Sequence, residues 1–212
     1  MENFESYLTE VIETKVKLSE YIDFQKMKFK TNLNLQDKPG IYVFWWIGKK
    51  DVLKDLNRKV LIKGAGGKKH AEEYSFDWFD ETLIENKEYP LYVGKTTKLR
   101  QRISQHLMLE TKPDNWFDNF KDQKEITSKD FQLNEGEYYL FPNRNSSCQF
   151  RAGMQLLLKD QHHEDFWKII EENISISIIK STNEKNTFVK RFYLEDYLIG
   201  ALRPWFNLDS ER

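Results

Sequence analysis

The sequence has a single cysteine, no long apolar run and almost no net charge. Cys148 alone excludes an internal disulfide and a cysteine-based zinc cluster, and it fits a reducing compartment. No stretch approaches the roughly 18 apolar residues that a membrane span requires, and residues 1–30 are charged throughout, unlike a secretory signal. We therefore expect a soluble, cytoplasmic protein that does not associate with membranes.

The charge balance also limits the nucleic-acid partners. The 33 Lys and Arg residues against 34 Asp and Glu residues give a net charge of -1, so a DNA or RNA site must be a local basic patch. Residues 63–70 (KGAGGKKH) are glycine-rich and basic, but Ile62 and Lys69 break the spacing of a nucleotide-binding loop. This stretch is predicted to be a basic loop that either contacts a nucleic-acid backbone through Lys68 and Lys69 or is simply solvated.

The basic patch that the sequence does offer lies in residues 92–106 (YVGKTTKLRQRISQH). The pattern predicts the end of a strand, a turn at Gly94 and a helix capped by Thr96 or Thr97. No acidic residue interrupts its cations, which are Lys95, Lys98, Arg100 and Arg102. Leu99, Ile103 and Leu107 recur at steps of four and should face the core, while Arg102 and His106 share a neighbouring face. One helix face therefore offers both side chains to an anionic ligand.

Three short apolar runs predict the core strands, namely residues 41–47, 91–93 and 174–179, and residues 137–141 form a candidate fourth strand. Apolar residues of about helical period predict a helix or helix pair within residues 3–30. Residues 149–159 lead into a further helix, and the last helix is predicted over 188–202, where Pro204 ends it.

One carboxylate breaks the pattern of that last helix. At 100° per residue, Glu195 falls at about 340°, inside the stripe formed by Phe188, Phe192, Ile199 and Leu202. A carboxylate that faces the core costs several kcal/mol unless it meets a cation, a metal or several donors. Glu195 is thus interpreted either as half of an ion pair with Arg102 or Lys95, or as a ligand of a hard metal such as Mg²⁺.

Together these residue types suit phosphodiester hydrolysis. The attacking water needs a base, the pentavalent phosphate needs positive charge, and the leaving 3′ oxygen needs a Lewis acid. A tyrosine is a poor base at its free pKa of about 10, so Lys95 or the metal would have to favour the phenolate.

Two short motifs begin and end near the predicted strands, namely residues 40–42 (GIY) and residues 92–94 (YVG). They match the two halves of a family signature, and the sequence resembles the GIY-YIG nuclease superfamily. The matching elements that follow are the lysine after the second motif (Lys95), the helix arginine and histidine (Arg102 and His106), the metal-binding glutamate (Glu195) and the closing asparagine (Asn207). The resemblance covers residues 39–47, 90–109 and 174–208.

This resemblance implies an α+β fold, with a small three-stranded, mainly antiparallel sheet flanked by helices. We expect one nuclease domain over residues 1–212, with an N-terminal helical arm (1–38) and two large insertions (48–90 and 110–173). The two motifs lie 50 positions apart, whereas family members usually separate them by a short hairpin. Long insertions resemble those of the type II restriction endonucleases of this superfamily.

The resemblance also implies a mechanism of one-metal hydrolysis with Mg²⁺ or Mn²⁺. Tyr42 or Tyr92 would act as the base, Lys95 would lower the pKa of the phenol and Arg102 would hold the phosphate. His106 would relay a proton or hydrogen-bond at the site, Glu195 would carry the metal, and Asn207 would orient a neighbour. Lys98, Arg100, Lys68 and Lys69 would contact the nucleic acid.

The leading hypothesis is a metal-dependent DNA endonuclease that recognises sequence in double-stranded DNA and serves restriction or phage defence. The alternatives are a structure-specific repair nuclease and a non-catalytic nucleic-acid-binding module with the same fold. With one active site per chain, cutting both strands requires a homodimer or two sequential nicks.

Overall fold

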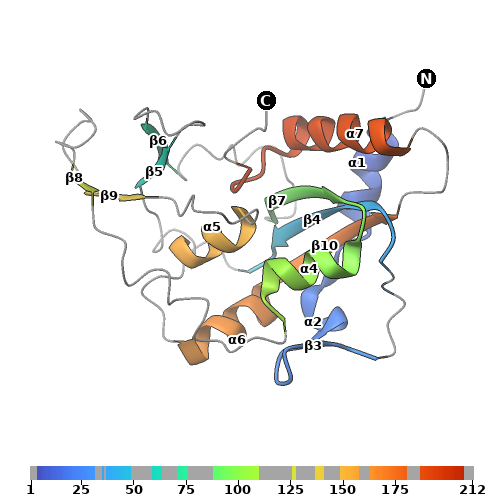
Figure 1. The fold of residues 1–212 in the computed structure, drawn as a ribbon, viewed down its shortest axis with the longest axis horizontal. Coiled ribbons are helices and arrows are strands. Elements are labelled where there is room, and N and C mark those ends of the chain that lie inside the picture. The colour runs from blue at the N-terminus through green and yellow to red at the C-terminus, as the bar shows by residue number, and fades with distance from the viewer. Residues whose placement is uncertain are drawn as a thin grey trace.

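The main sheet of the protein contains four antiparallel strands in the order β1-β10-β4-β7 (Figure 1). The strands are β1 (Val16–Lys17), β4 (Gly40–Trp46), β7 (Tyr89–Thr96) and β10 (Ile174–Lys180). The structure is a computed structural model that describes residues 4–31, 35, 37–48, 59–63, 71–75, 88–109, 126–127, 137–140, 149–157, 163–180 and 187–207. The three predicted core strands are present, and β7 is longer than predicted.

The centre of the sheet joins the two halves of the signature. All of β4 is buried, as its β-branched and aromatic residues predict. Tyr42 of β4 pairs with Gly94 of β7, and Phe44 pairs with Tyr92, before a bulge shifts the register between Phe44 and Trp45. The 50 positions that separate Tyr42 from Tyr92 in the sequence therefore do not separate the motifs in space.

Of the helix or helix pair predicted for residues 3–30, the structure has two helices, but short strands interrupt and follow them. The helix α1 (Phe4–Glu13) ends early, and β1, α2 (Leu18–Tyr21), β2 (Ile22–Asp23) and β3 (Lys28–Phe29) follow it. Val16 and Lys17 pair with Ile176 and Ser175 at the edge of β10, which adds a fourth strand to the three that were predicted. Backbone hydrogen bonding to that edge overrides the helical pattern of the sequence.

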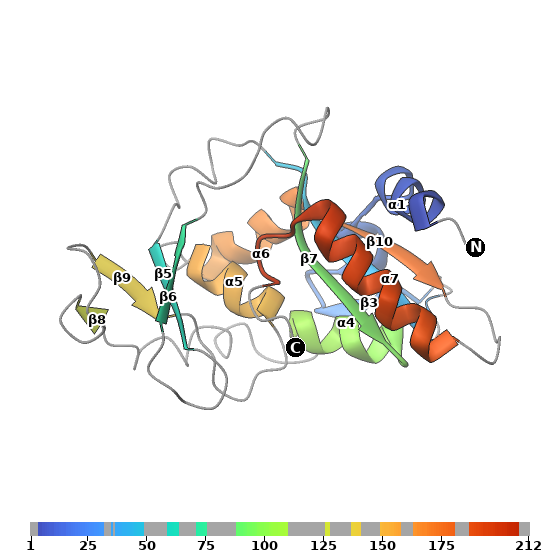
Figure 2. The same cartoon turned by 90° about the horizontal axis from the view of Figure 1, so that it is seen from above.

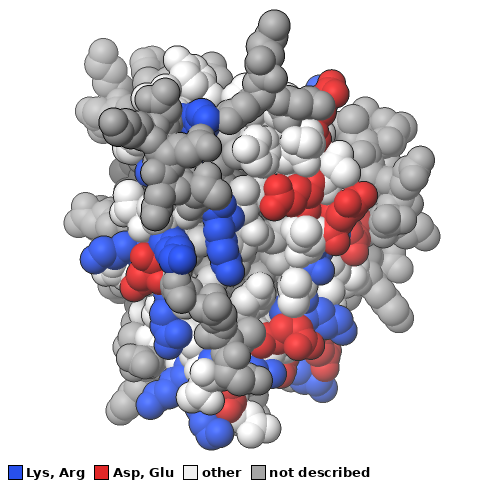
Figure 3. Space-filling model, turned by 90° about the vertical axis from the view of Figure 1, so that its right-hand side faces the viewer, with Lys and Arg blue, Asp and Glu red and all other residues white. Residues whose placement is uncertain are grey.

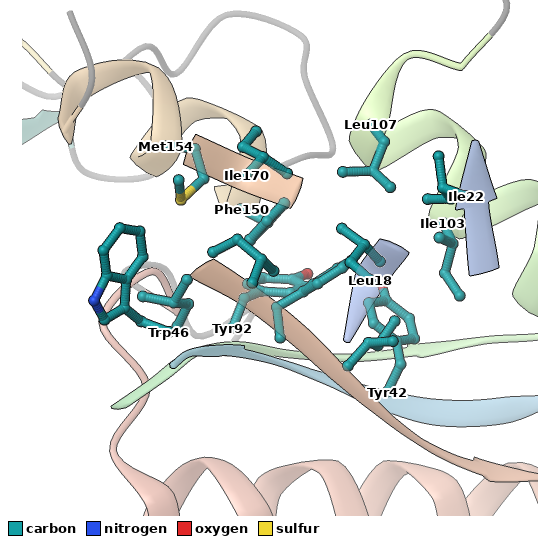
Figure 4. Packing of buried hydrophobic residues seen from close by; sticks show 14 of the residues in the cluster. Leu18, Ile22, Tyr42, Trp46, Tyr92, Ile103, Leu107, Phe150, Met154 and Ile170 are labelled. Atoms are coloured by element: carbon teal, nitrogen blue, oxygen red, sulfur yellow. The ribbon is translucent and has the colours of Figure 1, made fainter. Parts of the chain in front are cut away.

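Helices cover both faces of the sheet (Figure 2). The helices α1 and α7 (Thr187–Leu202) lie on one face, where Val11, Trp45 and Leu198 are fully buried. The other face carries α4 (Leu99–Leu107), α5 (Gln149–Leu157) and α6 (His163–Asn173), with Phe150 and Ile170 in the core (Figure 4). Both α5 and α6 fall inside the range predicted as the second insertion. In the described part of the chain, no helix is long and apolar enough to cross a membrane.

The two predicted insertions contribute strands to a second sheet, in the order β6-β5-β9-β8. Its strands are β5 (Lys59–Lys63), β6 (Ala71–Ser75), β8 (Ile126–Thr127) and β9 (Glu137–Leu140). The parallel pairing of β5 with β9 joins segments from the first and second insertions. The candidate strand at residues 137–141 is therefore present, although its role is to connect the insertions.

The inner face of α7 is rotated from its predicted position. Leu194, Leu198 and Leu202 face the sheet, whereas Phe188 and Phe192 are 67% and 41% exposed. The predicted stripe was right at Leu202 and Ile199, which pack in or against this core, and wrong at Phe188 and Phe192. The sheet contacts the neighbouring face of the helix, which carries Leu194 and Leu198. Glu195 consequently lies at the border of the buried face, not at its centre.

Candidate functional site

The outer edge of β7 is bound by two side chains from the C-terminal part of the chain. The backbone N–H of Lys95 donates to Oε1 of Glu195 at 2.9 Å. The side-chain amide of Asn207 accepts from the N–H of Val93 and donates to its carbonyl, both at 2.8 Å. These hydrogen bonds satisfy backbone N–H and C=O groups of β7 that have no neighbouring strand to pair with, because β7 is an edge strand. Glu195 and Asn207 are thereby fixed two strand positions apart.

Between those two positions lies Gly94, against which both signature tyrosines pack. A Cβ atom at Gly94 would lie 2.4 Å from Oη of Tyr42 and 2.8 Å from Cε1 of Tyr92. Such distances are far inside van der Waals contact, so the tyrosine rings can occupy their positions only because residue 94 has no side chain. Figure 4 shows Tyr42 and Tyr92 on the face of the sheet opposite α7.

The hydroxyl of Tyr42 is hydrogen-bonded to Nε2 of His106 at 2.5 Å, and both residues are fully buried. The ring of Tyr92 contacts the same histidine edge-on, at 5.2 Å between centroids. Burial holds the pKa of His106 well below 6.5, and the charges of Arg102 and Arg151 lower it further. The imidazole is therefore neutral at pH 7, so Nε2 is able to accept a hydrogen bond from the phenol in the appropriate tautomer.

On the α7 side of the sheet, Glu195 forms an ion pair with the ammonium group of Lys95. Lys95 pairs in register with Ile41, whose side chain belongs to the α7 core, so Lys95 points away from the tyrosine face. Burial raises the pKa of Glu195 above its usual range, although the hydrogen bonds and the charge of Lys95 oppose the shift. Lys95 thus compensates the carboxylate only in part, which favours a second cation at this position.

The carboxylate of Glu195 is the donor that this site could offer to a divalent metal. No group of three or more His, Cys, Asp and Glu side chains that could enclose an ion occurs among the described residues. Mg²⁺ at phosphate sites commonly uses one or two carboxylates and completes its shell with water and phosphate oxygens. Glu195 supplies one such carboxylate, and its incomplete neutralisation by Lys95 agrees with this donor set.

The helix α4 begins later than predicted and is capped by a distant residue. Lys98 occupies the N-cap position, and neither Thr96 nor Thr97 caps the helix. Instead, Oδ1 of Asp37 accepts from the N–H of Gln101 at 2.8 Å. Asp37 therefore plays the part of an N-cap side chain from the segment that precedes β4.

The cations of α4 do not all lie at the same place. Arg102 is half-buried, one helical turn before His106, and its guanidinium contacts Oε1 of Gln105 at 3.4 Å. Lys98 and Arg100 are exposed at the start of α4, with Arg100 over the ring of Phe29 at 4.6 Å. Lys68 and Lys69 lie outside the described residues.

The predicted site residues thus lie in two groups on opposite faces of the sheet, beside Gly94 of β7. Tyr42, Tyr92, Arg102 and His106 approach from the α4 face, Lys95 and Glu195 from the α7 face, and Asn207 from the strand edge. Sequence reasoning missed Arg151, whose Nη1 donates to the carbonyl of Gln105 at 3.0 Å and whose charge reaches His106. No local signal marks Arg151, because it lies in a separate helix 45 positions after His106.

Comparison with known protein families agrees with this geometry. Residues 83–147 match the family model described as the GIY-YIG catalytic domain. The match includes Tyr92, Lys95, Arg102 and His106, and it supports a place in the GIY-YIG superfamily and a nuclease domain in this chain. It does not reach Tyr42, Glu195 or Asn207, which contact β7 at three consecutive positions, Gly94, Lys95 and Val93 respectively. No curated protein and no solved structure matches the chain.

Proposed function

We propose that this protein is a metal-dependent DNA endonuclease that hydrolyses phosphodiester bonds beside the edge of β7. One observation supports this proposal above all. A tyrosine–histidine hydrogen bond and a lysine–glutamate ion pair lie on opposite faces of the sheet at the adjacent positions Gly94 and Lys95, and Arg102 is one helical turn from His106. A base, a phosphate-binding cation and a metal ligand are the three groups that the reaction requires.

Tyr42 is the better candidate for the base. Its hydroxyl is hydrogen-bonded to the neutral His106, which orients the phenol, and the ring of Tyr92 contacts the same histidine. In the role of base, the phenolate form of Tyr42 would accept a proton from the attacking water. Tyr92 would shape the tyrosine face and exclude bulk water from it.

The remaining roles in the proposed reaction fall to Arg102, Lys95 and Glu195. Arg102 would bind the phosphate, where its planar group suits two oxygens. Lys95 would balance Glu195 before substrate binds and would stabilise negative charge near the reacting phosphate. Glu195 would hold Mg²⁺ or Mn²⁺, whose chemistry here is Lewis-acid stabilisation of the leaving 3′ oxygen. Asn207 would keep the β7 edge in position.

The biological role that we propose is restriction or phage defence on double-stranded DNA. The sheet built from both insertions supports this role, because a nuclease core with extra structured segments has surface for sequence recognition. A structure-specific repair nuclease would instead favour branched or nicked DNA. Mapping the cut ends after digestion of mixed genomic DNA, beside assays on branched and nicked substrates, separates the two roles.

The test of the proposed chemistry is cleavage of supercoiled plasmid in Mg²⁺ or Mn²⁺. We expect wild type to cut, Arg102→Ala to lose at least about 100-fold in rate because it removes a transition-state cation, and the neighbouring Gln101→Ala to cut like wild type. If purified wild type leaves varied DNA uncut with either metal, or if Arg102→Ala cuts as fast as Gln101→Ala, the proposed site is wrong.

A further inference from the structure

The first two turns of α7 expose an unusual group of apolar side chains. Phe188, Val189, Phe192 and Tyr193 are 67%, 55%, 41% and 60% exposed, and among the described residues only Ile12 joins them as a large exposed hydrophobic. We call Phe188, Phe192 and Tyr193 the α7 aromatic surface. Singly exposed apolar residues are common, but a group on one helix face indicates a binding surface.

This surface is continuous with the proposed active site. The ammonium group of Lys95 lies 4.5 Å from the ring centroid of Phe192 while it pairs with Glu195. The rings of Phe192 and Tyr193 meet edge to face, with centroids 6.3 Å apart. A nucleic acid with a phosphate at Lys95 would therefore place the next nucleotide over or beside the α7 aromatic surface.

Charge indicates which kind of partner fits. Arg191 is only 8% exposed, its Nη1 has no hydrogen-bond partner among the described residues, and its guanidinium lies 6.0 Å from the ring of Phe188. A buried donor without an acceptor is costly, so an anion supplied by a partner would satisfy it. Residues 187–193 also include Lys190 and no acidic residue.

The surrounding end of the molecule has the same character. Figure 3 faces the end at which α4 and α7 begin, and there Lys and Arg gather mainly on one half while Asp and Glu gather mainly on the other. A polyanion is attracted to the half that carries the Lys and Arg side chains.

We propose that the α7 aromatic surface stacks on unpaired bases of the nucleic-acid substrate next to the bond that is cut. This inference rests on the proposed nuclease function and adds that the bound substrate has at least one unstacked nucleotide beside the site. Aromatic side chains bind any base through its π-face, whereas bases inside an intact duplex already stack on their neighbours. Single-stranded or locally opened DNA is thus the preferred ligand of this surface.

The test measures binding without catalysis, by fluorescence anisotropy in EDTA with a labelled single strand and the matching duplex. The perturbed variant is Phe188→Leu with Tyr193→Leu, which keeps apolar bulk and removes both rings. Phe192 is left intact because it contacts Lys95. We expect single-strand affinity to fall about 5-fold to 100-fold for each stacked base, and the aromatic control, Phe188→Tyr with Tyr193→Phe, to bind within about twofold of wild type.

The outcomes separate this inference from the nuclease proposal. If the leucine variant, with unchanged thermal stability, binds the single strand like wild type, the inference is wrong even where plasmid cleavage shows a nuclease. If it loses affinity while no variant or wild type cuts DNA, the surface is a binding site and the nuclease proposal fails. A wild-type dimer in sedimentation that the leucine variant converts to a monomer, at unchanged DNA affinity, would also overturn the inference.

Discussion

Replacing Tyr42 by phenylalanine tests the buried pair that links the sheet to α4. The substitution removes one oxygen and no carbon, so it creates almost no cavity. The lost hydrogen bond to His106, at 2.5 Å and with both partners fully buried, contributes about 0.5–1.5 kcal/mol, and the cost rises to about 3 kcal/mol where the histidine nitrogen finds no replacement. We therefore expect Tyr42→Phe to lower the free energy of unfolding by about 1–3 kcal/mol.

Chemical denaturation and thermal unfolding measure this effect. For a chain of this size the melting temperature should fall by about 2–4 °C for each kcal/mol. The control is Tyr193→Phe, whose ring is 60% exposed and whose replacement should change stability by less than about 0.5 kcal/mol. Equal stability of the two variants would refute the idea that the Tyr42–His106 bond holds the site together.

A second substitution makes the same test more selective. His106→Leu alone removes the other partner, and the double variant with Tyr42→Phe removes both polar groups. Because replacing both partners by apolar groups is often nearly neutral, the double variant should be less destabilised than the sum of the two single variants by about 0.5–3 kcal/mol. Strict additivity would mean that the two side chains do not interact.

Three further predictions follow from charge and packing. Because folding lowers the pKa of His106, the unfolded chain binds more protons than the folded protein below pH 6.5. The free energy of unfolding of wild type should therefore fall with decreasing pH in that range, by up to about 1.4 kcal/mol per pH unit relative to His106→Leu. Denaturation at several pH values measures this difference, and parallel curves for the two proteins would contradict the prediction. Gly94→Ala should cost about 1–3 kcal/mol and cleavage activity, because the new methyl group displaces the Tyr42 hydroxyl; a variant as stable and active as wild type would refute the packing. Arg191→Met should raise the free energy of unfolding by about 1–3 kcal/mol, because Nη1 of Arg191 is buried with no hydrogen-bond partner in the described part of the chain. The control Lys180→Met, at an exposed position, should change the free energy of unfolding little, and destabilisation by Arg191→Met would contradict this assignment.

Local patterns in the sequence predicted the elements that depend on local physics. The apolar runs at β4 and β10 marked buried strands, and Pro204 marked the end of α7. The sequence left two interpretations of Glu195, as half of an ion pair or as a metal ligand. For the ion pair, the structure has Lys95 and not Arg102 as the partner. The ion pair between Lys95 and Glu195 forms because α7 packs beside β7, and no local sequence pattern predicts that packing.

The remaining features arise from contacts between distant segments. Asp37 caps α4 across 64 positions, so reading the nearest threonines as the cap failed. The inner face of α7 follows its leucines because the sheet packs against them, which helical periodicity alone could not distinguish from the aromatic stripe. Likewise, Val16 and Lys17 pair with the edge of β10, although they lie in a segment whose apolar periodicity predicts a helix.

The most direct test of the nuclease proposal is the initial rate at which wild type, Glu195→Gln and Asp196→Asn cut supercoiled plasmid in Mg²⁺. Asp196 is the exposed neighbour of Glu195 on α7, so its variant controls for the loss of one negative charge. We predict cleavage by wild type and Asp196→Asn, and a loss of at least about 100-fold in Glu195→Gln, because Glu195 would hold the metal. Equal rates for Glu195→Gln and Asp196→Asn would contradict the proposed site.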